Sequence, residues 1–362
     1  MQSWLLVAFL VAVVVWIIYL MLRRDSLAQF DQPPGQLFRA SNQAAQAASA
    51  SALEVINQRL RSSPASSTKL SIKQRIPLIR HSMENFFAED QKHCVSSFTP
   101  ADAGGVPAEW VVAPAVDRGN GRRFLYIHGG AFMAGSPKSH RIITSKLSEI
   151  TDSAVLSIDY RLIPENSRMA GVEDCRTAYQ WLLANGPEGE AAASCVMVAG
   201  DSAGGNLTLS LLAWLRDSGG RAPDAALALS PVTDLRFSSP SILGNLESDV
   251  MLRPLAHRLT RLPRWLISVG ARIMAGHSTK DPVYSPLLGD LSNLPPILVI
   301  ASEHEILRDD GRRYANKAAA AGTQATYLGW ANMPHVWPIF YPSLPEAGEA
   351  FEQIEAFFNQ HT

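Results

Sequence analysis

The chain has 362 residues, of which 47% are hydrophobic and 18% are charged, so it can bury a large core. Its net charge of −1 offers no basic surface that would favour binding to nucleic acid. Three cysteines are too few and too scattered for a disulfide framework or a zinc site. The sequence contains no H-E-x-x-H motif, no P-loop and no dinucleotide glycine motif, so we expect no metal and no organic cofactor.

The first element is an uncharged run from Trp4 to Leu22, long enough to cross a bilayer core of roughly 30 Å. A cleavable signal peptide is disfavoured, because no basic residue precedes the run and no small-residue cleavage site follows it. We expect residues 1–24 to form a single-pass anchor that contacts the membrane through residues 4–22. Arg23 and Arg24 follow the run, so the positive-inside tendency places the rest of the chain in the cytoplasm.

A tether and two helices are predicted between the anchor and the first strands. Residues 25–52 contain Pro33-Pro34-Gly35 and a segment biased toward Ala, Ser and Gln, which is typical of a linker. Residues 53–61 and 72–87 carry apolar side chains near helical spacing. We expect residues 53–90 to form cap helices over a later active site; simple packing on the flank of the domain is the alternative.

From Val95 onward the pattern changes to strands and then to alternating strands and helices. This alternation predicts an α/β fold with a mostly parallel sheet, helices on both faces and functional loops at the carboxyl ends of the strands. We assign a catalytic domain to 91–362, with an insert at about 235–281 that is apolar around Trp265 and is the second cap candidate. The predicted strands are 109–114, 123–127, 154–159, 195–199, 225–230, 296–301 and 325–329, and the predicted helices are 171–185, 207–217, 307–322 and 349–359.

Gly200-Asp201-Ser202-Ala203-Gly204 fits the pattern G-x-S-x-G at a turn from a predicted strand to a predicted helix. A serine on such a turn has a strained backbone and projects its hydroxyl from the edge of the sheet, while the glycines remove Cβ atoms that would collide there. The amino end of the helix also favours a developing negative charge. Ser202 is therefore the predicted nucleophile.

The run H-G-G-A-F from residue 128 to residue 132 follows a predicted strand. Small residues at a strand end allow several backbone N–H groups to turn toward one point, as an oxyanion hole requires. We predict that Gly129, Gly130 and Ala131 supply such donors together with the N–H of Ala203. The histidine that opens the run is expected to anchor the loop rather than to carry a proton.

A serine nucleophile needs a base, and the base needs an acid that orients it. His335 is the predicted base because it lies in a loop between the last predicted strand and the last predicted helix. The less favoured histidines are His140, His257 and His277, which lie in predicted helices or in the insert. His304 is also less favoured, because it lies in the loop after the predicted strand 296–301, next to the acid candidates.

Four acids compete for the third position, and all follow the predicted strand 296–301. Asp309 and Asp310 fall in the first turn of a helix, where carboxylates usually serve the helix dipole. Glu303 and Glu305 lie in the loop, and Glu305 stands at its end. The order serine, acid, histidine is the order expected for an α/β-hydrolase arrangement.

These motifs resemble those of hormone-sensitive-lipase-like α/β-hydrolases, which include bacterial family IV esterases and arylacetamide deacetylases. The resemblance covers roughly Val95 to the C-terminus, and its motifs occur in the right order. They are His128–Phe132, Asp159-Tyr160-Arg161-Leu162 with Pro164-Glu165, Gly200–Asn206, Ser230-Pro231, Asp234-Leu235, Ser285-Pro286-Leu287, Leu294-Pro295-Pro296, Glu305-Ile306-Leu307 with Asp309-Asp310, and Met333-Pro334-His335. The resemblance implies the α/β-hydrolase fold, a two-part cap and a triad of Ser202, Glu305 and His335.

The function expected from the sequence is that of a membrane-anchored serine carboxylesterase or lipase that hydrolyses small-molecule or lipid esters through an acyl-enzyme. A phospholipid-remodelling lipase at the bilayer surface is one alternative, suggested by the anchor and the apolar insert. A tethered binding protein that has lost turnover is another, although the complete set of reactive residues argues against it. An amidase or an acyltransferase would share the triad.

Overall fold

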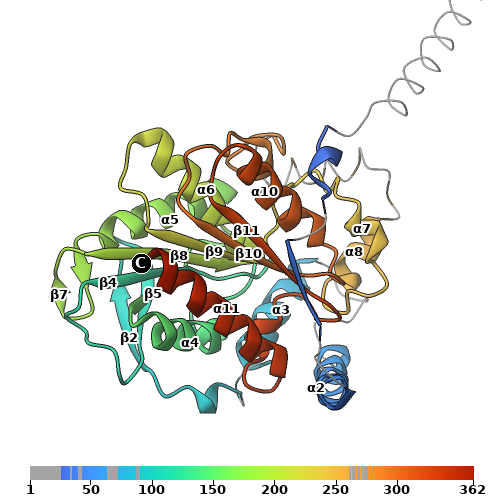
Figure 1. Ribbon diagram of the computed structural model, residues 1–362, viewed down its shortest axis with the longest axis horizontal. Coiled ribbons are helices and arrows are strands. Elements are labelled where there is room, and N and C mark those ends of the chain that lie inside the picture. Colours follow the sequence, from blue (N-terminus) through green and yellow to red (C-terminus); the bar gives the residue numbers. More distant parts are fainter. Residues whose placement is uncertain are drawn as a thin grey trace, which may run out of the picture.

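A nine-stranded sheet runs through the described part of the chain (Figure 1). The computed structural model describes residues 26–32, 35–39, 43–62, 72–86, 88, 90–260, 262, 266, 270, 272, 276 and 278–362. In order across the sheet, the strands are β1 (Gln36–Phe38), β11 (Ala325–Trp330), β10 (Ile297–Ser302), β9 (Ala225–Leu229), β8 (Cys195–Asp201), β4 (Arg122–Ile127), β5 (Ala154–Ile158), β3 (Pro107–Val112) and β2 (Ser97–Asp102). Neighbours are parallel from β1 to β5, and β3 and β2 are antiparallel at one edge. The predicted, mostly parallel sheet is confirmed.

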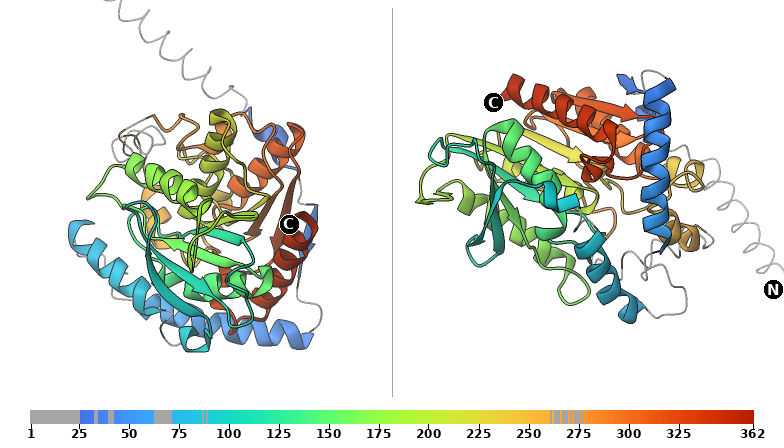
Figure 2. Two further views of the ribbon diagram at one scale, coloured as in Figure 1. Left: turned by 90° about the vertical axis from the view of Figure 1, so that its left-hand side faces the viewer. Right: turned by 90° about the horizontal axis from the view of Figure 1, so that it is seen from below.

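Helices cover both faces of the sheet (Figures 1 and 2). One face carries α5 (Arg168–Leu182), α6 (Ala203–Ser218) and α10 (Arg308–Ala320), and the other carries α4 (Arg141–Thr151) and α11 (Pro345–His361). The remaining helices are α2 (Gln43–Ser62), α3 (Ile72–Phe86), α7 (Ser241–Gly244) and α8 (Arg253–Leu259). The short elements are η1 (Ala28–Phe30), η3 (Asp90–His93), η4 (Lys138–His140), η5 (Pro286–Leu288), η6 (Trp337–Phe340), β6 (Asn185–Gly186) and β7 (Gly189–Glu190).

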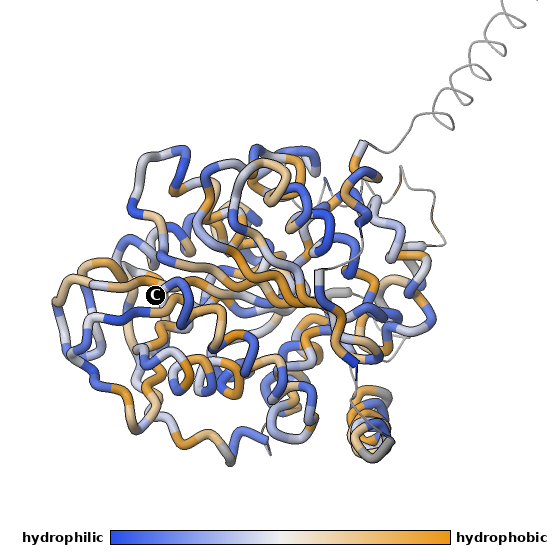
Figure 3. The backbone as a smooth tube through the Cα atoms, viewed as in Figure 1, coloured by the Kyte–Doolittle hydropathy of each residue, from blue (hydrophilic) through white to orange (hydrophobic). Residues whose placement is uncertain are grey.

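The central strands are buried along their whole length. No residue of β5, β9 or β10 is exposed, because helices on both faces remove both sets of alternating side chains from water. The central strands accordingly form the most hydrophobic part of the tube in Figure 3. Phe124 and Phe351 belong to the core toward α4 and α11, and Leu125 and Leu207 belong to the core toward α5 and α6.

The predicted strands and helices between residues 109 and 359 are all present, with ends that differ by at most four residues. The structure adds α4, which the sequence pattern does not predict. Its sequence R-I-I-T-S-K-L-S-E-I-T is rich in β-branched residues of modest helix propensity. Burial of Ile142, Ile143 and Leu147 against the sheet stabilises this helix instead.

Residues 25–52, predicted as a tether, contain ordered elements that contact the body of the protein. The strand β1 pairs in parallel with β11, and Phe38 stacks on Trp330 with ring centroids 4.0 Å apart. The Ala-rich part of this range belongs to α2, because alanine has the highest helix propensity. Ser49 of α2 also donates a short hydrogen bond to Glu346 of α11. The tether prediction is therefore wrong for the described part of this range.

The membrane anchor predicted at Trp4–Leu22 lies outside the described residues. Among the helices that the structure does describe, none is long and apolar enough to cross a bilayer. The apolar stretch around Trp265 also falls largely on residues outside the description, so the second half of the cap stays a prediction.

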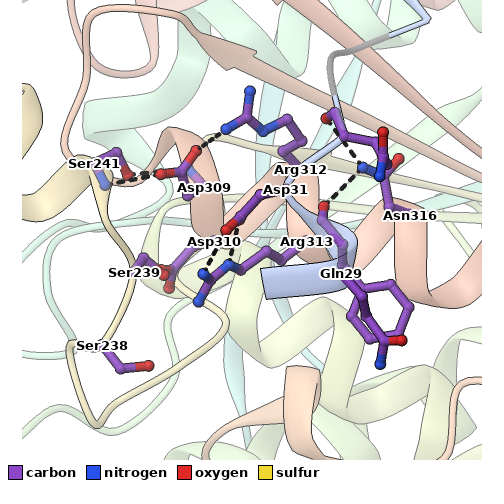
Figure 4. A network of polar contacts seen from close by, with 12 residues as sticks. Gln29, Asp31, Ser238, Ser239, Ser241, Asp309, Asp310, Arg312, Arg313 and Asn316 are labelled. Atoms are coloured by element: carbon purple, nitrogen blue, oxygen red, sulfur yellow. Dashed lines mark hydrogen bonds and ion pairs between the residues drawn. The ribbon is translucent and has the colours of Figure 1, made fainter. Parts of the chain in front are cut away.

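Asp309 and Asp310 do more than serve the dipole of α10, because they hold the chain that follows β9 (Figure 4). Asp309 accepts the N–H of Ser241 at 2.8 Å and pairs with Arg312. The fully buried Asp310 accepts the N–H groups of Thr233 and Asp234 at 2.7 and 3.0 Å. The two carboxylates thus join the start of the insert to α10.

Asp310 makes a testable contribution to the pH dependence of stability. Burial and the neighbouring Asp234 carboxylate raise the pKa of Asp310 to about 7. Between the unfolded pKa of about 4 and this value, the folded chain binds more protons than the unfolded chain, so Asp310 makes stability fall as pH rises. Over three pH units the difference reaches up to about 4 kcal/mol. We expect Asp310→Asn to flatten the denaturant-derived free energy of unfolding between pH 4 and 8.

The matched control for this measurement is Asp290→Asn, since Asp290 lies on the surface. That variant should retain the wild-type slope between pH 4 and 8. An Asp310→Asn protein with the same slope as the wild type would show that Asp310 does not titrate in this range.

Candidate active site

Ser202 lies on a strained turn between β8 and α6. Its φ of 52° and ψ of −112° lie in a region that L-amino acids rarely adopt. A Cβ atom on Gly200 would collide with the backbone of Gly204, and one on Gly204 would collide with the carbonyl of Ile127. The N–H of Ser202 is held by the carbonyl of Leu229 at 2.8 Å. Close backbone packing therefore keeps the turn in place.

The packing at Gly204 predicts a large loss of stability in Gly204→Ala. The added methyl group would displace the end of β4, and overpacking of this kind costs about 3 kcal/mol or more when backbone must move. Gly348→Ala is the matched control, because its Cβ meets no atom within 4 Å in α11 and alanine favours helix there. Thermal unfolding should show a lower Tm for the first variant and an equal or higher Tm for the second. Equal Tm values would contradict this account of the turn.

The loop after β4 presents free backbone donors next to this turn. Gly130, Ala131 and Phe132 have φ values of 115°, 54° and 63°, which turn the chain sharply. Within the described residues, the N–H groups of Gly130, Ala131 and Ala203 donate to no protein acceptor. These three N–H groups are therefore free to donate to a substrate, and they stay the predicted oxyanion donors.

Gly129 does not match that prediction. Its N–H donates to Asp201 Oδ1 at 2.9 Å and is therefore already used. A Cβ atom added at Gly129 would collide with the Asp201 carboxylate. Glycine is therefore required here by the close approach of that side chain and not by the formation of an oxyanion hole. The predicted set of donors narrows to Gly130, Ala131 and Ala203.

Asp201 and His140 form a buried pair behind the turn, and the sequence did not indicate it. His140 Nε2 lies 3.4 Å from Asp201 Oδ1, and Tyr126 donates its hydroxyl to the same oxygen at 2.7 Å. Burial opposes the charge on both groups, but their mutual attraction lowers the pKa of Asp201 and raises the pKa of His140. The mutual attraction therefore favours the charged form of the pair, and Asp201 fixes the loop through the N–H of Gly129.

His128 has the environment of a loop anchor. Burial and the nearby charge of His140 lower the pKa of His128 to about 3, so its ring is neutral. The ring stacks on Tyr160 at 4.4 Å between centroids, and the Tyr160 hydroxyl donates to the His128 carbonyl at 2.9 Å. Arg80 of α3 also contacts this loop and donates to the carbonyl of Met133 at 2.7 Å.

His335 and Glu305 are brought together at the ends of β11 and β10. Both side chains are buried, and His335 Nδ1 forms a short hydrogen bond with Glu305 Oε2. Burial opposes the charge of His335, but the adjacent carboxylate outweighs it and raises the pKa of His335 above its ordinary value of about 6.5. Burial also raises the pKa of Glu305, while His335 counteracts that rise.

The other predicted acids have different partners. Glu303 accepts the Tyr327 hydroxyl at 3.2 Å, and the two aspartates of α10 hold the segment after β9. Glu305 itself is oriented by the N–H of Ser302, which donates to Oε1 at 2.8 Å. Among the four candidates, Glu305 is the carboxylate that contacts His335.

The loops that carry Ser202 and His335 meet at the end of β9. Val336 donates its N–H to Ser230 Oγ at 3.2 Å, and the residue before Ser230 accepts the N–H of Ser202. Ser202 Oγ has no hydrogen-bond partner among the described residues. The structure thus places His335 and Glu305 in contact and joins their loop to the serine turn through Ser230.

Two residues of the insert position the acid loop and were not predicted. Asn245 donates to the carbonyl of Glu305 at 2.8 Å, and the buried Asp249 accepts the N–H of Ile306 at 2.9 Å. No spacing or motif in the sequence indicates these contacts. Within the described residues, no group of three or more His, Cys, Asp or Glu side chains is arranged to hold a metal ion.

The chain is similar to known α/β-hydrolases and esterases. A family model described as alpha/beta hydrolase fold matches residues 124–339. An acetyl-hydrolase of Streptomyces hygroscopicus is 39% identical over 260 residues, which are 72% of this chain and 81% of that protein. A carboxylesterase/phospholipase of Mycobacterium tuberculosis is 37% identical over 257 residues, which are 70% of this chain and 67% of that protein.

The solved structures include a close match to an esterase from the bacterial hormone-sensitive lipase family. It has 32% sequence identity and a TM-score of 0.74, and the match covers 86% of this chain and 98% of that one. The chain therefore belongs to the α/β-hydrolase-fold family, among the hormone-sensitive-lipase-like esterases, and is a carboxylic-ester hydrolase.

Proposed function

We propose that this hydrolase acts through an acyl-enzyme formed on Ser202, with His335 as base and Glu305 as the acid that orients it. The observation that carries the proposal is the buried His335–Glu305 pair, whose loop is joined to the strained Ser202 turn through Ser230. Glu305 at Nδ1 leaves Nε2 as the ring nitrogen that can take a proton.

In the proposed reaction, His335 removes the hydroxyl proton of Ser202 as the serine oxygen attacks the ester carbonyl. The tetrahedral oxyanion accepts hydrogen bonds from Gly130, Ala131 and Ala203. His335 then gives its proton to the leaving alcohol, and the C–O bond to that alcohol breaks. The same histidine activates water, which releases the acid and restores Ser202.

A series of p-nitrophenyl esters from acetate to palmitate tests the proposal and orders its alternatives. An optimum at short chains supports a small-ester esterase, while a long-chain optimum favours a lipase. A folded protein without activity on any chain length would overturn ester hydrolysis through Ser202. Parallel assays with matched amides and acceptor alcohols would then identify an amidase or an acyltransferase.

We also propose that residues 4–22 anchor the enzyme to a membrane and that the catalytic domain lies close to the bilayer on the cytoplasmic side. Leu27 is buried in the core, and Asp31 forms a two-point ion pair with the buried Arg313 of α10, with oxygen–nitrogen distances of 2.6 and 2.8 Å (Figure 4). Few residues therefore separate the uncharged run from the domain. The short connection favours substrates that reach the enzyme from a lipid surface.

Membrane fractionation of the full chain and of a chain starting at Ser26 tests this second proposal. The full chain should sediment with membranes and resist high salt, whereas the shortened chain should not. In sealed vesicles with the cytoplasmic face outward, added protease should digest the catalytic domain. Hydrolysis of phospholipid vesicles by the full chain would support the phospholipase alternative, and a lack of it would leave soluble or neutral esters.

A further inference from the structure

Arg168, the first residue of α5, is a buried cation with few partners. Its side chain is only 4% exposed, and within the described residues its hydrogen bonding is limited to Nη2, which donates to Asn206 Oδ1 at 2.7 Å. Its Nε is buried and donates to no acceptor. No carboxylate of the described chain forms an ion pair with it. A guanidinium carries five N–H donors, so most of its capacity is unused.

Other buried arginines of this protein are better satisfied. Arg313 forms the two-point ion pair with Asp31, and Arg123 donates to the carbonyls of Asn185 and Arg122. Arg168 instead lies over the ring of Phe132, with its central carbon 3.5 Å from the ring centroid.

The surroundings of Arg168 do not neutralise its charge. Burial lowers the pKa of Arg168 to about 10, so the group stays cationic near pH 7. The ionisable groups around it are Tyr160, Cys175 and Tyr284, and burial raises the pKa of each, so they are uncharged. A buried charge without a counter-ion is unfavourable unless a ligand of opposite charge binds next to it.

Arg168 lies beside the proposed reaction centre. Phe132, on which it stacks, directly follows Ala131, whose N–H is a proposed oxyanion donor in the loop after β4. Asn206, to which it donates, binds the Ser202 carbonyl through its own N–H at 3.1 Å. The apolar cluster next to it joins this loop to the acid loop and contains Val232, Leu235, Tyr284, Ile306 and Leu307, with Phe132 and Met169 packed against it.

We propose that Arg168 binds a negatively charged group of the substrate, a carboxylate or a phosphate, so that this enzyme prefers anionic esters. This inference rests on the proposed function of the same site. The unused N–H groups of a guanidinium match two oxygens of either anion, and such charge-assisted bonds are strong where water is excluded. An anionic group would also neutralise the buried cation.

The test compares esters that differ in charge but not in length. Mono-p-nitrophenyl glutarate carries a free carboxylate, and p-nitrophenyl valerate does not. We expect Arg168→Met to lower the ratio of kcat/KM for glutarate over valerate by about 10- to 100-fold, the effect of losing hydrogen bonds to a charged group. Arg176→Met is the matched control, because Arg176 lies on the same helix and stacks on Trp214 at 4.9 Å. That variant should keep the wild-type ratio.

A second pair identifies the anion. Monobutyryl glycerol 3-phosphate is compared with monobutyryl glycerol in the wild type and in Arg168→Met. A ratio that falls only for the phosphate pair assigns phosphate as the ligand, and one that falls only for the glutarate pair assigns carboxylate. Equal losses on charged and neutral esters in both pairs would overturn the proposal and leave Arg168 a packing role.

Three further measurements separate this proposal from its rivals. Removing an unpaired buried charge should leave the Tm of Arg168→Met equal to or above that of the wild type, whereas a packing role predicts a lower Tm. If Arg168→Met does not fold, Arg168→Lys should give a smaller fall in both ratios, since it keeps the charge without the planar fork. Calorimetric binding of monomethyl glutarate and methyl valerate to Ser202→Ala, with and without the Arg168 change, tests recognition even if Ser202 proves not to be the nucleophile.

Discussion

Ser202→Ala should lower kcat for p-nitrophenyl esters by about 10⁴- to 10⁶-fold, because the variant lacks the oxygen proposed to attack the carbonyl. Residual hydrolysis would come from binding and from the oxyanion donors that remain in place. The Tm should be unchanged, since alanine keeps the Cβ atom and Ser202 Oγ makes no hydrogen bond within the described residues. Measured turnover and thermal unfolding together distinguish lost chemistry from lost structure.

Ser218→Ala at the other end of α6 is the matched control. Its hydroxyl bonds to the carbonyl of Leu215 in its own helix, far along the chain from the turn, so its kcat should equal the wild-type value. Near-normal turnover in Ser202→Ala would exclude an acyl-enzyme at this residue. A mass increase equal to the acyl group, seen only in proteins that retain Ser202, would support the intermediate directly.

Glu305→Gln should lower kcat by about 10³- to 10⁴-fold, because the variant would hold His335 in the wrong tautomer. The Ser302 N–H donates to Glu305 Oε1, so a glutamine would place its carbonyl there and turn its NH₂ toward His335 Nδ1. His335 Nδ1 would then have to accept, and the ring proton would move to Nε2. The nitrogen proposed to take the serine proton would already be occupied.

The same variant should shift the pH profile in a defined direction. Neutral His335 is the proposed base, so kcat/KM falls as pH drops through its pKa. The Glu305 carboxylate outweighs burial and raises the pKa of His335, so removing that charge should move the acid limb of the profile to lower pH. Glu303→Gln, two residues away, should change neither the rate nor the limb. Equal losses in the two variants, or an unmoved acid limb in Glu305→Gln, would contradict the assigned role of Glu305.

Much of the fold follows from local sequence. The strands that are covered on both faces are mostly apolar, and the glycines of the Ser202 turn stand where a Cβ atom would meet the backbone of β4 or of the turn itself. Such features depend on a few neighbouring residues and on general sterics. They therefore predicted the alternation of strands and helices, the serine turn, and the loops that hold His335 and the acid candidates.

The tertiary structure decided which groups meet. It joined Asp201 to Gly129 and removed that N–H from the oxyanion set, and it placed Asn245 and Asp249 of the insert on the acid loop. These partners are far apart in the chain, so nothing in local periodicity or spacing can pair them.

Residues 36–38 and Arg168 show the same difference between what local sequence predicts and what tertiary structure decides. Residues 36–38 read as part of a linker because three residues carry little periodic signal, and their pairing with β11 depends on an edge that exists only once the sheet has formed. Arg168 lies outside the predicted helix 171–185 and belongs to no motif, and only folding buries it beside Phe132 and Asn206. The sequence by itself determined the fold class and the residue types of the proposed reaction centre. Burial and long-range contact, which arise only from packing distant segments together, decided their partners and charges.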